Sequence, residues 1–291
     1  MTPSPATPVP LAAPAPRRRR LRWTADLLVG VLLTGSVALL VAFAGVLFPA
    51  GTDLMDLAAR LQPPRFTLPH PLGTDPIGRD VLSRVVYGGR ISLLVGLVSV
   101  ALSAVIGTVL GLLAGYYRAT VGAVLMRFAD VQLAFPFILL AITVIAIIGP
   151  GLWKLIAVMV VSQWAQYARL VRGQVLALRE REYVQAAQAL GANDSRMMFR
   201  HIIPNAIGPI VVLATLNVAN NILLESGLTF LGLGVDPQVP SWGGMLADGR
   251  TYLQTAWWVS VFPGIAITLT VLGFNLLGDW FRDRLDPHGR R

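Results

Sequence analysis

The residue types that most often perform catalysis or bind metals are scattered along this chain of 291 residues. The three histidines, His70, His201 and His288, lie too far apart in sequence to form a two-histidine zinc helix. The one lysine, Lys154, is not followed by Ser or Thr, so the chain lacks the Gly-Lys-Ser/Thr loop that binds nucleotide phosphates. The Gly-x-Ser-x-Gly motif of hydrolases is also missing from the sequence. We therefore expect neither an enzyme nor a metal or cofactor site.

A polar stretch, 180–204, has instead the features of a binding element. Its residues from Glu182 to Leu190 have the spacing of a short amphipathic helix. One face of that helix holds a tyrosine, two alanines and a leucine: Tyr183, Ala186, Ala187 and Leu190. Gly191 can end the helix, because glycine adopts a positive φ without steric cost. Three residues that follow can cap a second helix that ends near Pro204: Asn193, Asp194 and Ser195. The pattern predicts a rigid helix–turn–helix, here called the elbow, which either docks on a partner outside the bilayer or lies on the inner lipid surface.

Apolar runs dominate the rest of the chain. It is 55% hydrophobic and only 13% charged, and about 20 apolar residues are enough to cross the hydrocarbon core of a bilayer. We expect an all-α, polytopic membrane protein with six transmembrane helices, near 27–48, 92–117, 124–148, 152–171, 206–224 and 257–280. The elbow lies between the fourth and the fifth of these spans.

The predicted organisation has four parts: a disordered, basic cytoplasmic N-terminus (1–22), a first span with an extracytoplasmic loop (23–89), a core of five spans (90–281) and a cytoplasmic tail (282–291). In the loop, Thr74 or Asp75 is expected to cap a helix that starts at Pro76. Arginines gather in the terminal segments and in the elbow, so the positive-inside rule places both termini and the elbow in the cytoplasm. The net charge of +9 therefore reflects membrane topology, and we expect no nucleic-acid partner.

Several predicted spans contain polar side chains that are costly when they face lipid. In the fourth and fifth spans these are Gln163, Gln166, Asn217, Asn220, Asn221 and Glu225. Two interpretations stay open for them: hydrogen bonds between helices, or the lining of a polar pathway. In the third span, which also contains Pro136, Asp130 is expected to pair with Arg127 three residues away. Small residues at every fourth position from Ser99 to Gly115 predict a helix-packing face in the second span.

Four segments, in this order, resemble the dipeptide/oligopeptide/nickel group of ABC transporter permeases: HPLGTDPIGRDVLSRVVYGGRISLLVG, EYVQAAQALGAND with RHIIPN, ESGLTFLGLG with PSWGGML, and GFNLLGDWFRDRLDP. The resemblance covers nearly everything after Pro49 and is strongest to the second, C-type subunit of the permease pair. The resemblance implies the transmembrane domain of a type I ABC importer.

The resemblance also implies a role for the elbow, which matches the family's Glu-Ala-Ala coupling motif with Gln185 where the family often has Glu. In that family the elbow docks on a cytoplasmic ATP-binding subunit. The residues that the resemblance assigns to this contact are Tyr183, Gln185, Ala186, Ala187, Leu190, Gly191, Ala192, Asn193 and Asp194.

Further partners follow from the same resemblance: a companion permease subunit, two cytoplasmic ATP-binding subunits that bind ATP and Mg, and an extracytoplasmic solute-binding protein. The chain would form half of a translocation pathway in a bacterial plasma membrane, most often for di- or oligopeptides. The alternative is a channel or secondary transporter that works without ATP. Secondary transporters often contain internal repeats, and the two halves of this chain show no convincing repeat.

Overall fold

Long helices form from the apolar runs of the sequence. The computed structural model describes residues 25–52, 54–117 and 120–285, which fold into helices joined by loops. The predicted N-terminal segment 1–22 and residues 286–291 of the predicted tail lie outside these described residues. The long helices are α1 (Ala25–Ala42), α3 (Val81–Tyr116), α6 (Leu152–Arg179), α9 (Ile203–Phe230) and α11 (Trp258–Leu285). The prediction of an all-α protein is confirmed.

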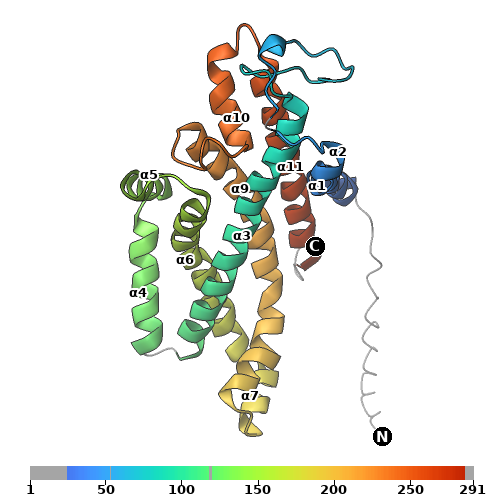
Figure 1. Cartoon of the computed structure of the whole chain (residues 1–291). Helices are drawn as coiled ribbons and strands as arrows, with labels where there is room; N and C mark the ends of the chain where they lie inside the picture. Colours follow the sequence, from blue (N-terminus) through green and yellow to red (C-terminus); the bar gives the residue numbers. More distant parts are fainter. Residues whose placement is uncertain (1–24, 53, 118–119, 286–291) are drawn as a thin grey trace, which may run out of the picture.

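Helices α3, α6, α9 and α11 run side by side, α1 crosses them at a steep angle in this view, and further short elements lie at the two ends of the bundle (Figure 1). Helix α1 packs on α11, α11 on α9, and α3 on both α6 and α9. One end, here called the elbow end, holds α7 (Glu182–Ala189) and α8 (Asp194–Arg196). The opposite end, here called the loop end, holds α10 (Trp242–Gly249) and the segment between α2 (Ala44–Leu47) and α3. Single turns at η1 (Leu57–Ala59) and η3 (Arg250–Tyr252) complete the loop end.

Length and apolarity identify the helices that can cross a membrane. Among the described residues, four pass this test: α1, α3, the stretch Asp194–Phe230 that ends with α9, and α11. Helices α4 (Thr120–Ala134) and α5 (Phe137–Ile148) pass it together, as a pair bent by 85°. Helix α6 is long enough, at 28 residues, but too polar to pass on composition. The described residues therefore contain four helices that are long and apolar enough to span a membrane, or five with the bent pair, and the six-span topology stays a prediction.

The predicted third span, near 124–148, is divided into two helices, α4 and α5, with a sharp bend between them. Pro136 immediately precedes α5 and has an extended conformation, with φ −60° and ψ 122°. Proline has no N–H to donate and disfavours helical geometry in the residue before it, so α4 ends at Ala134 and the helix does not continue through Phe135. Figure 1 shows α5 turned almost across the direction of α4.

Helices α3 and α6 approach closely along the predicted face of small residues. Ser99, Ser103 and Gly107 are all buried there. A Cβ added at Gly107 would lie 2.4 Å from the carbonyl oxygen of Trp164 in α6, so a larger residue would separate the two backbones. Without a hydrophobic effect between helices in lipid, such close approach is the main source of attraction. The prediction of a packing face is confirmed, and α6 is its partner.

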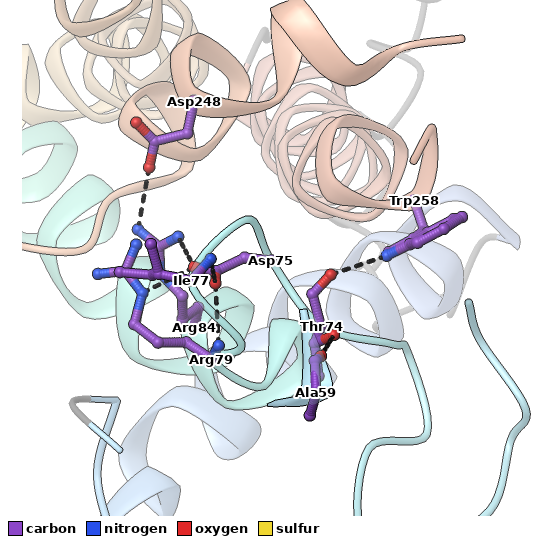
Figure 2. A network of polar contacts seen from close by, with 8 residues as sticks. All are labelled: Ala59, Thr74, Asp75, Ile77, Arg79, Arg84, Asp248 and Trp258. Atoms are coloured by element: carbon purple, nitrogen blue, oxygen red, sulfur yellow. Dashed lines mark hydrogen bonds and ion pairs between the residues drawn. The ribbon is translucent and has the colours of Figure 1, made fainter. Parts of the chain in front are cut away.

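Buried polar contacts hold the loop end together (Figure 2). The side chain of Asp75 is fully buried, and its Oδ2 accepts hydrogen bonds from Nε of Arg79 and Nη1 of Arg84, each at 2.7 Å. Arg84, in the first turn of α3, also donates through Nη2 to Oδ2 of Asp248 in α10 at 3.3 Å. The ion pairs thus join the loop to α3 and α10.

The helix expected from Pro76 does not form. Helix α3 begins at Val81, and its N-cap is Asp80, whose carboxylate accepts a backbone N–H three residues further on at 2.7 Å. Thr74 does not cap a helix, because its hydroxyl accepts the N–H of Gln62 and donates to the carbonyl oxygen of Ala59, while its own carbonyl accepts the indole N–H of Trp258 at 3.0 Å (Figure 2). The prediction placed the helix start too early, because Thr74 contacts the loop and α11, and the carboxylate of Asp75 pairs with Arg79 and Arg84.

Candidate functional site

The first helix of the elbow forms where the sequence predicts it. Helix α7 spans Glu182–Ala189, and Glu182 in the first turn is favourable next to the positive end of the helix dipole. Leu190 is the C-cap, and Gly191 follows with φ +81°. Nothing lies within 4 Å of the position that a Cβ at Gly191 would occupy. The backbone conformation is therefore what requires glycine, and the predicted stop is confirmed.

The second helix begins as predicted but does not end at the predicted proline. Asn193 is the N-cap of α8, with its Oδ1 accepting the N–H of Arg196 at 2.9 Å. The chain then continues through the π-helical segment η2 (Met197–Ile202) into α9, with Pro204 in the first turn of α9. Proline has no N–H to donate, and Pro204 lies directly after the π-helical segment, where the α-helical hydrogen-bond pattern is already interrupted. Pro204 therefore starts a long helix, and the elbow is joined to it without a break.

The elbow is anchored on its inward side. Met198 and Ile202 of η2 are buried in an apolar cluster with Leu112 of α3 and with Val171 and Val175 of α6. The cluster connects the base of the elbow to three long helices at once, because η2 leads directly into α9. Movement of the elbow therefore cannot be independent of these helices.

The outward side of the elbow exposes apolar side chains. Leu190 is 89% exposed, Phe199 65% and Tyr183 45%, whereas Val184 on the inward side is 2% exposed. The other residues assigned to a partner contact are exposed at Gln185, Ala186, Gly191, Asn193 and Asp194, and half-buried at Ala187 and Ala192. Exposed apolar side chains on an element outside the bundle are typical of an interaction site.

The polar residues of α6 and α9 divide into two sets. Gln163 of α6 and Asn221 of α9 exchange amide hydrogen bonds, and Asn221 also donates to Oγ of Ser99 in α3 at 2.7 Å. Asn217 of α9 donates to the hydroxyl of Tyr167 in α6 at 3.0 Å. All five side chains are buried, so this first set joins α3, α6 and α9.

Glu225 of α9 belongs to the same buried set. It has no exposed surface, and its carboxylate accepts hydrogen bonds from Ser92 of α3 and from Thr229, each at 2.9 Å. The second set comprises Gln166 and Asn220, which are exposed in the isolated chain. The structure thus places four of the six predicted polar residues between helices and two on the surface.

Asp130 of α4 has a partner that sequence spacing did not indicate. Its Oδ1 accepts a hydrogen bond from Nη2 of Arg169 in α6 at 2.6 Å, and not from Arg127 as expected. The pairing spans 39 residues of sequence, so no local rule could find it. Both side chains are more than half exposed, at 54% for Asp130 and 57% for Arg169. With Gln166, three residues before Arg169, the pair forms a polar patch on α4 and α6.

Comparison with known proteins identifies the family. Residues 107–291 match the family described as the binding-protein-dependent transport system inner membrane component. The chain belongs to this permease family. A dipeptide transport permease of Alkalihalophilus pseudofirmus is 42% identical over 293 residues, 99% of this chain and 96% of the relative. A glutathione transport permease of Pectobacterium atrosepticum is 47% identical over 218 residues, 75% and 72% of the two chains.

Solved structures support the fold of the permease. A methionine ABC transporter in an inward-facing conformation has a TM-score of 0.55 at 20% identity, covering 70% of this chain and 97% of the other. An amino acid ABC transporter has a TM-score of 0.54 at 14% identity, covering 70% and 94%. At these identities the likeness concerns the fold, which is that of an ABC importer transmembrane domain.

Membership in the family has direct consequences. The permease is a multi-pass, inner-membrane component of an importer that depends on a binding protein, and ATP hydrolysis belongs to partner subunits. The resemblance that the four sequence segments indicated is confirmed, and the importer is favoured over a channel that works without ATP. Within the described ranges, no group of three or more His, Cys, Asp or Glu could hold a metal ion.

Proposed function

We propose that this permease forms half of the translocation pathway of an ATP-driven importer of di- or oligopeptides. The names of its relatives support the substrate, because they are transport permeases for dipeptides, for di- and tripeptides, and for glutathione. A companion permease forms the other half of the pathway. Two cytoplasmic subunits bind ATP with Mg and hydrolyse it, and an extracytoplasmic binding protein delivers the peptide.

In this proposal the bundle crosses a bacterial plasma membrane six times, with the elbow end and both termini in the cytoplasm. The arginines around the elbow support this orientation: Arg179, Arg181, Arg196 and Arg200. The bent pair α4–α5 and the polar helix α6 provide the third and fourth spans. A helix as polar as α6 is stable in a bilayer when its polar side chains face protein or water.

The observation that supports the function best is that the elbow exposes an apolar side chain at its tip while its base is buried among the long helices. Leu190 is 89% exposed while Ile202 is fully buried among long helices. A cytoplasmic ATP-binding subunit that covers the tip can therefore move the base. Such a subunit can shift the permease between inward and outward openings only if it binds the elbow with different affinity in the two states.

The experiment that tests this function replaces Leu190 by Lys in the full complex. We expect L190K to be inserted normally and to lose most of the ATP-binding subunits on co-purification, because a charge replaces the exposed apolar contact. Leu68, also 89% exposed but at the loop end, provides the matched control L68K. L68K should retain the ATP-binding subunits. Full retention by L190K, or equal loss from both variants, would contradict the proposed docking.

The pathway itself is proposed to run along the polar patch on α4 and α6. Asp130, Arg169 and Gln166 are exposed in the isolated chain, as is Asn220 of α9. Charged and amide groups at membrane depth are costly against lipid, so this surface is expected to face water or the companion permease. The buried residues Gln163, Asn217, Asn221 and Glu225 would then hold the pathway helices in place.

A further inference from the structure

Tyr116 lies where α3, α6 and the elbow meet. It is the last residue of α3, and its hydroxyl donates a hydrogen bond to Oδ1 of Asp194, the first residue of α8, at 2.7 Å. The two residues are 78 positions apart in sequence. The bond therefore ties the elbow sideways to a helix that is not its neighbour along the chain.

The end of α6 holds Tyr116 from another direction. Arg179, the last residue of α6, donates through Nη1 to the carbonyl oxygen of Tyr116, and its guanidinium lies 5.0 Å from the centroid of the Tyr116 ring. The last carbonyls of a helix have no donor within the helix, and a cation there also complements the helix dipole. The charge above the ring adds a cation–π attraction. These contacts orient the ring so that its hydroxyl meets the elbow.

Tyr116 cannot move without α3 and α6, because these two helices are tightly packed against each other. Along the packed face, a Cβ added at Gly107 or at Gly111 would lie 2.4 Å from a carbonyl oxygen of α6. Contacts this close leave no room for α3 to slide without α6. Helix α3 is 36 residues long, about 54 Å at 1.5 Å per residue, and reaches from the elbow end to the loop end. At the loop end Arg84 of α3 contacts Asp248 of α10.

The buried base of the elbow contacts α3 through Leu112, and the bond of Tyr116 lies further out on the elbow. Met198 and Ile202 anchor η2, whereas Asp194 lies beyond η2 at the start of α8. Only a π-helical turn and the short α8 separate the two regions, and such a turn departs from the regular pattern of α-helical hydrogen bonds. The Tyr116 hydroxyl therefore supplies a direct connection from the outer part of the elbow to α3.

We propose that Tyr116 is a positioning residue that transmits movement of the elbow to α3, and through α3 to the loop end. The inference rests on the proposed function, in which a partner ATPase moves the elbow. It assigns to Tyr116 no contact with peptide or nucleotide. Its hydroxyl acts through Asp194, and this hydrogen bond gives the coupling of hydrolysis to transport an outer path beside the one through the buried base of the elbow.

The test uses the complete importer, reconstituted with its binding protein, and the variant Y116F. The substitution removes only the hydroxyl and leaves the ring under Arg179. We expect unchanged subunit content and unchanged ATPase activity without the binding protein, and a several-fold lower ratio of dipeptide taken up to ATP hydrolysed. Y117F is the matched control, because Tyr117 is the next residue, is 45% exposed and contacts the Tyr116 ring edge-on at 5.3 Å. Y117F should keep the wild-type ratio.

A double-mutant cycle with D194A, which removes the acceptor, shows whether the hydroxyl acts through Asp194. If it does, adding Y116F to D194A changes the ratio no further, because the bond is already lost. A ratio for Y116F equal to that of Y117F would overturn the inference, as would an undiminished effect of Y116F in the D194A background. Loss of ATP-binding subunits from Y116F would overturn it too, because Tyr116 would then serve assembly. A wild-type complex without ATP hydrolysis dependent on the binding protein would refute the proposed function itself.

Discussion

At the scale of single residues, the buried carboxylate of Asp75 at the loop end has several hydrogen-bond partners. The carboxylate of Asp75 accepts hydrogen bonds from the backbone N–H groups of Ile77 and Arg79 at 2.9 Å, in addition to those from the side chains of Arg79 and Arg84. A buried carboxylate is tolerated when its oxygens are paired in this way. The pairing holds the start of α3 against the loop.

Removing this charge should destabilise the protein strongly. In D75N the guanidinium of Arg84, only 4% exposed, would keep just the longer contact with Asp248. Breaking a buried pair by removing one partner typically costs about 3–5 kcal/mol. D248N is the matched control, because the Asp248 side chain is 49% exposed and its loss should cost about 1 kcal/mol or less. Denaturant unfolding of the purified subunit in detergent would measure the loss of stability in D75N and in D248N. Equal losses in the two variants would contradict the role of Asp75 as the buried partner of Arg84.

Residue contacts of this kind mark the limit of what sequence could predict. The spacing of four between Asp75 and Arg79 is local, but Arg84 and Asp248 are 164 positions apart and meet only because α10 folds back over α3. The same holds for Asp130, which spacing paired with Arg127 and the fold pairs with Arg169. Local rules succeeded where the physics is local, at the Gly191 stop and the Asn193 cap.

At the scale of elements, periodicity identified faces but not their partners. Small residues at every fourth position predicted that α3 has a packing face, and nothing in that spacing could indicate α6 as the helix packed there. Prolines were harder to interpret. Pro136 separates two helices and Pro204 starts one, because the effect of proline depends on which N–H groups the surrounding fold leaves unpaired. The start of the second elbow helix was therefore predicted correctly, and its end near Pro204 was not.

The packed face of α3 can be tested by comparing a substitution at a buried glycine with one at an exposed glycine. In G107L the new side chain would meet the α6 backbone and Tyr167, whose Cβ lies 2.5 Å from the added Cβ. Overpacking of this kind costs typically about 1–3 kcal/mol or more, because the helices must separate. Gly173 of α6 has nothing within 4 Å of its added Cβ, so G173L should be tolerated. The amount of protease-resistant subunit in the membrane would separate the two variants. Equal resistance would contradict the close approach.

At the scale of the whole molecule, the sequence predicted the class of protein and the family. Which faces of the bundle contact lipid and which contact the pathway must be inferred from the exposed side chains. Apolar side chains cover most of the exposed surface of the bundle, including Val105 at 62% and Phe128 at 64%. The polar patch of Asp130, Arg169 and Gln166 interrupts that surface. A bilayer accepts the first kind of surface and excludes the second, so solvation alone distinguishes lipid-facing from pathway-facing helices.

The chain contains no cysteine, so single cysteines can report this distinction without background from the permease itself. Q166C and N220C should react with a charged, membrane-impermeant methanethiosulfonate in the reconstituted importer, because the reactive thiolate forms only in contact with water. V105C, on the apolar surface of α3, should not react. If the proposed pathway opens to alternate sides, the reagent should reach positions 166 and 220 from different sides of the membrane before and after trapping with ATP and vanadate. Inert cysteines at both positions in every state, or equal labelling of V105C, would move the pathway to another face of the bundle.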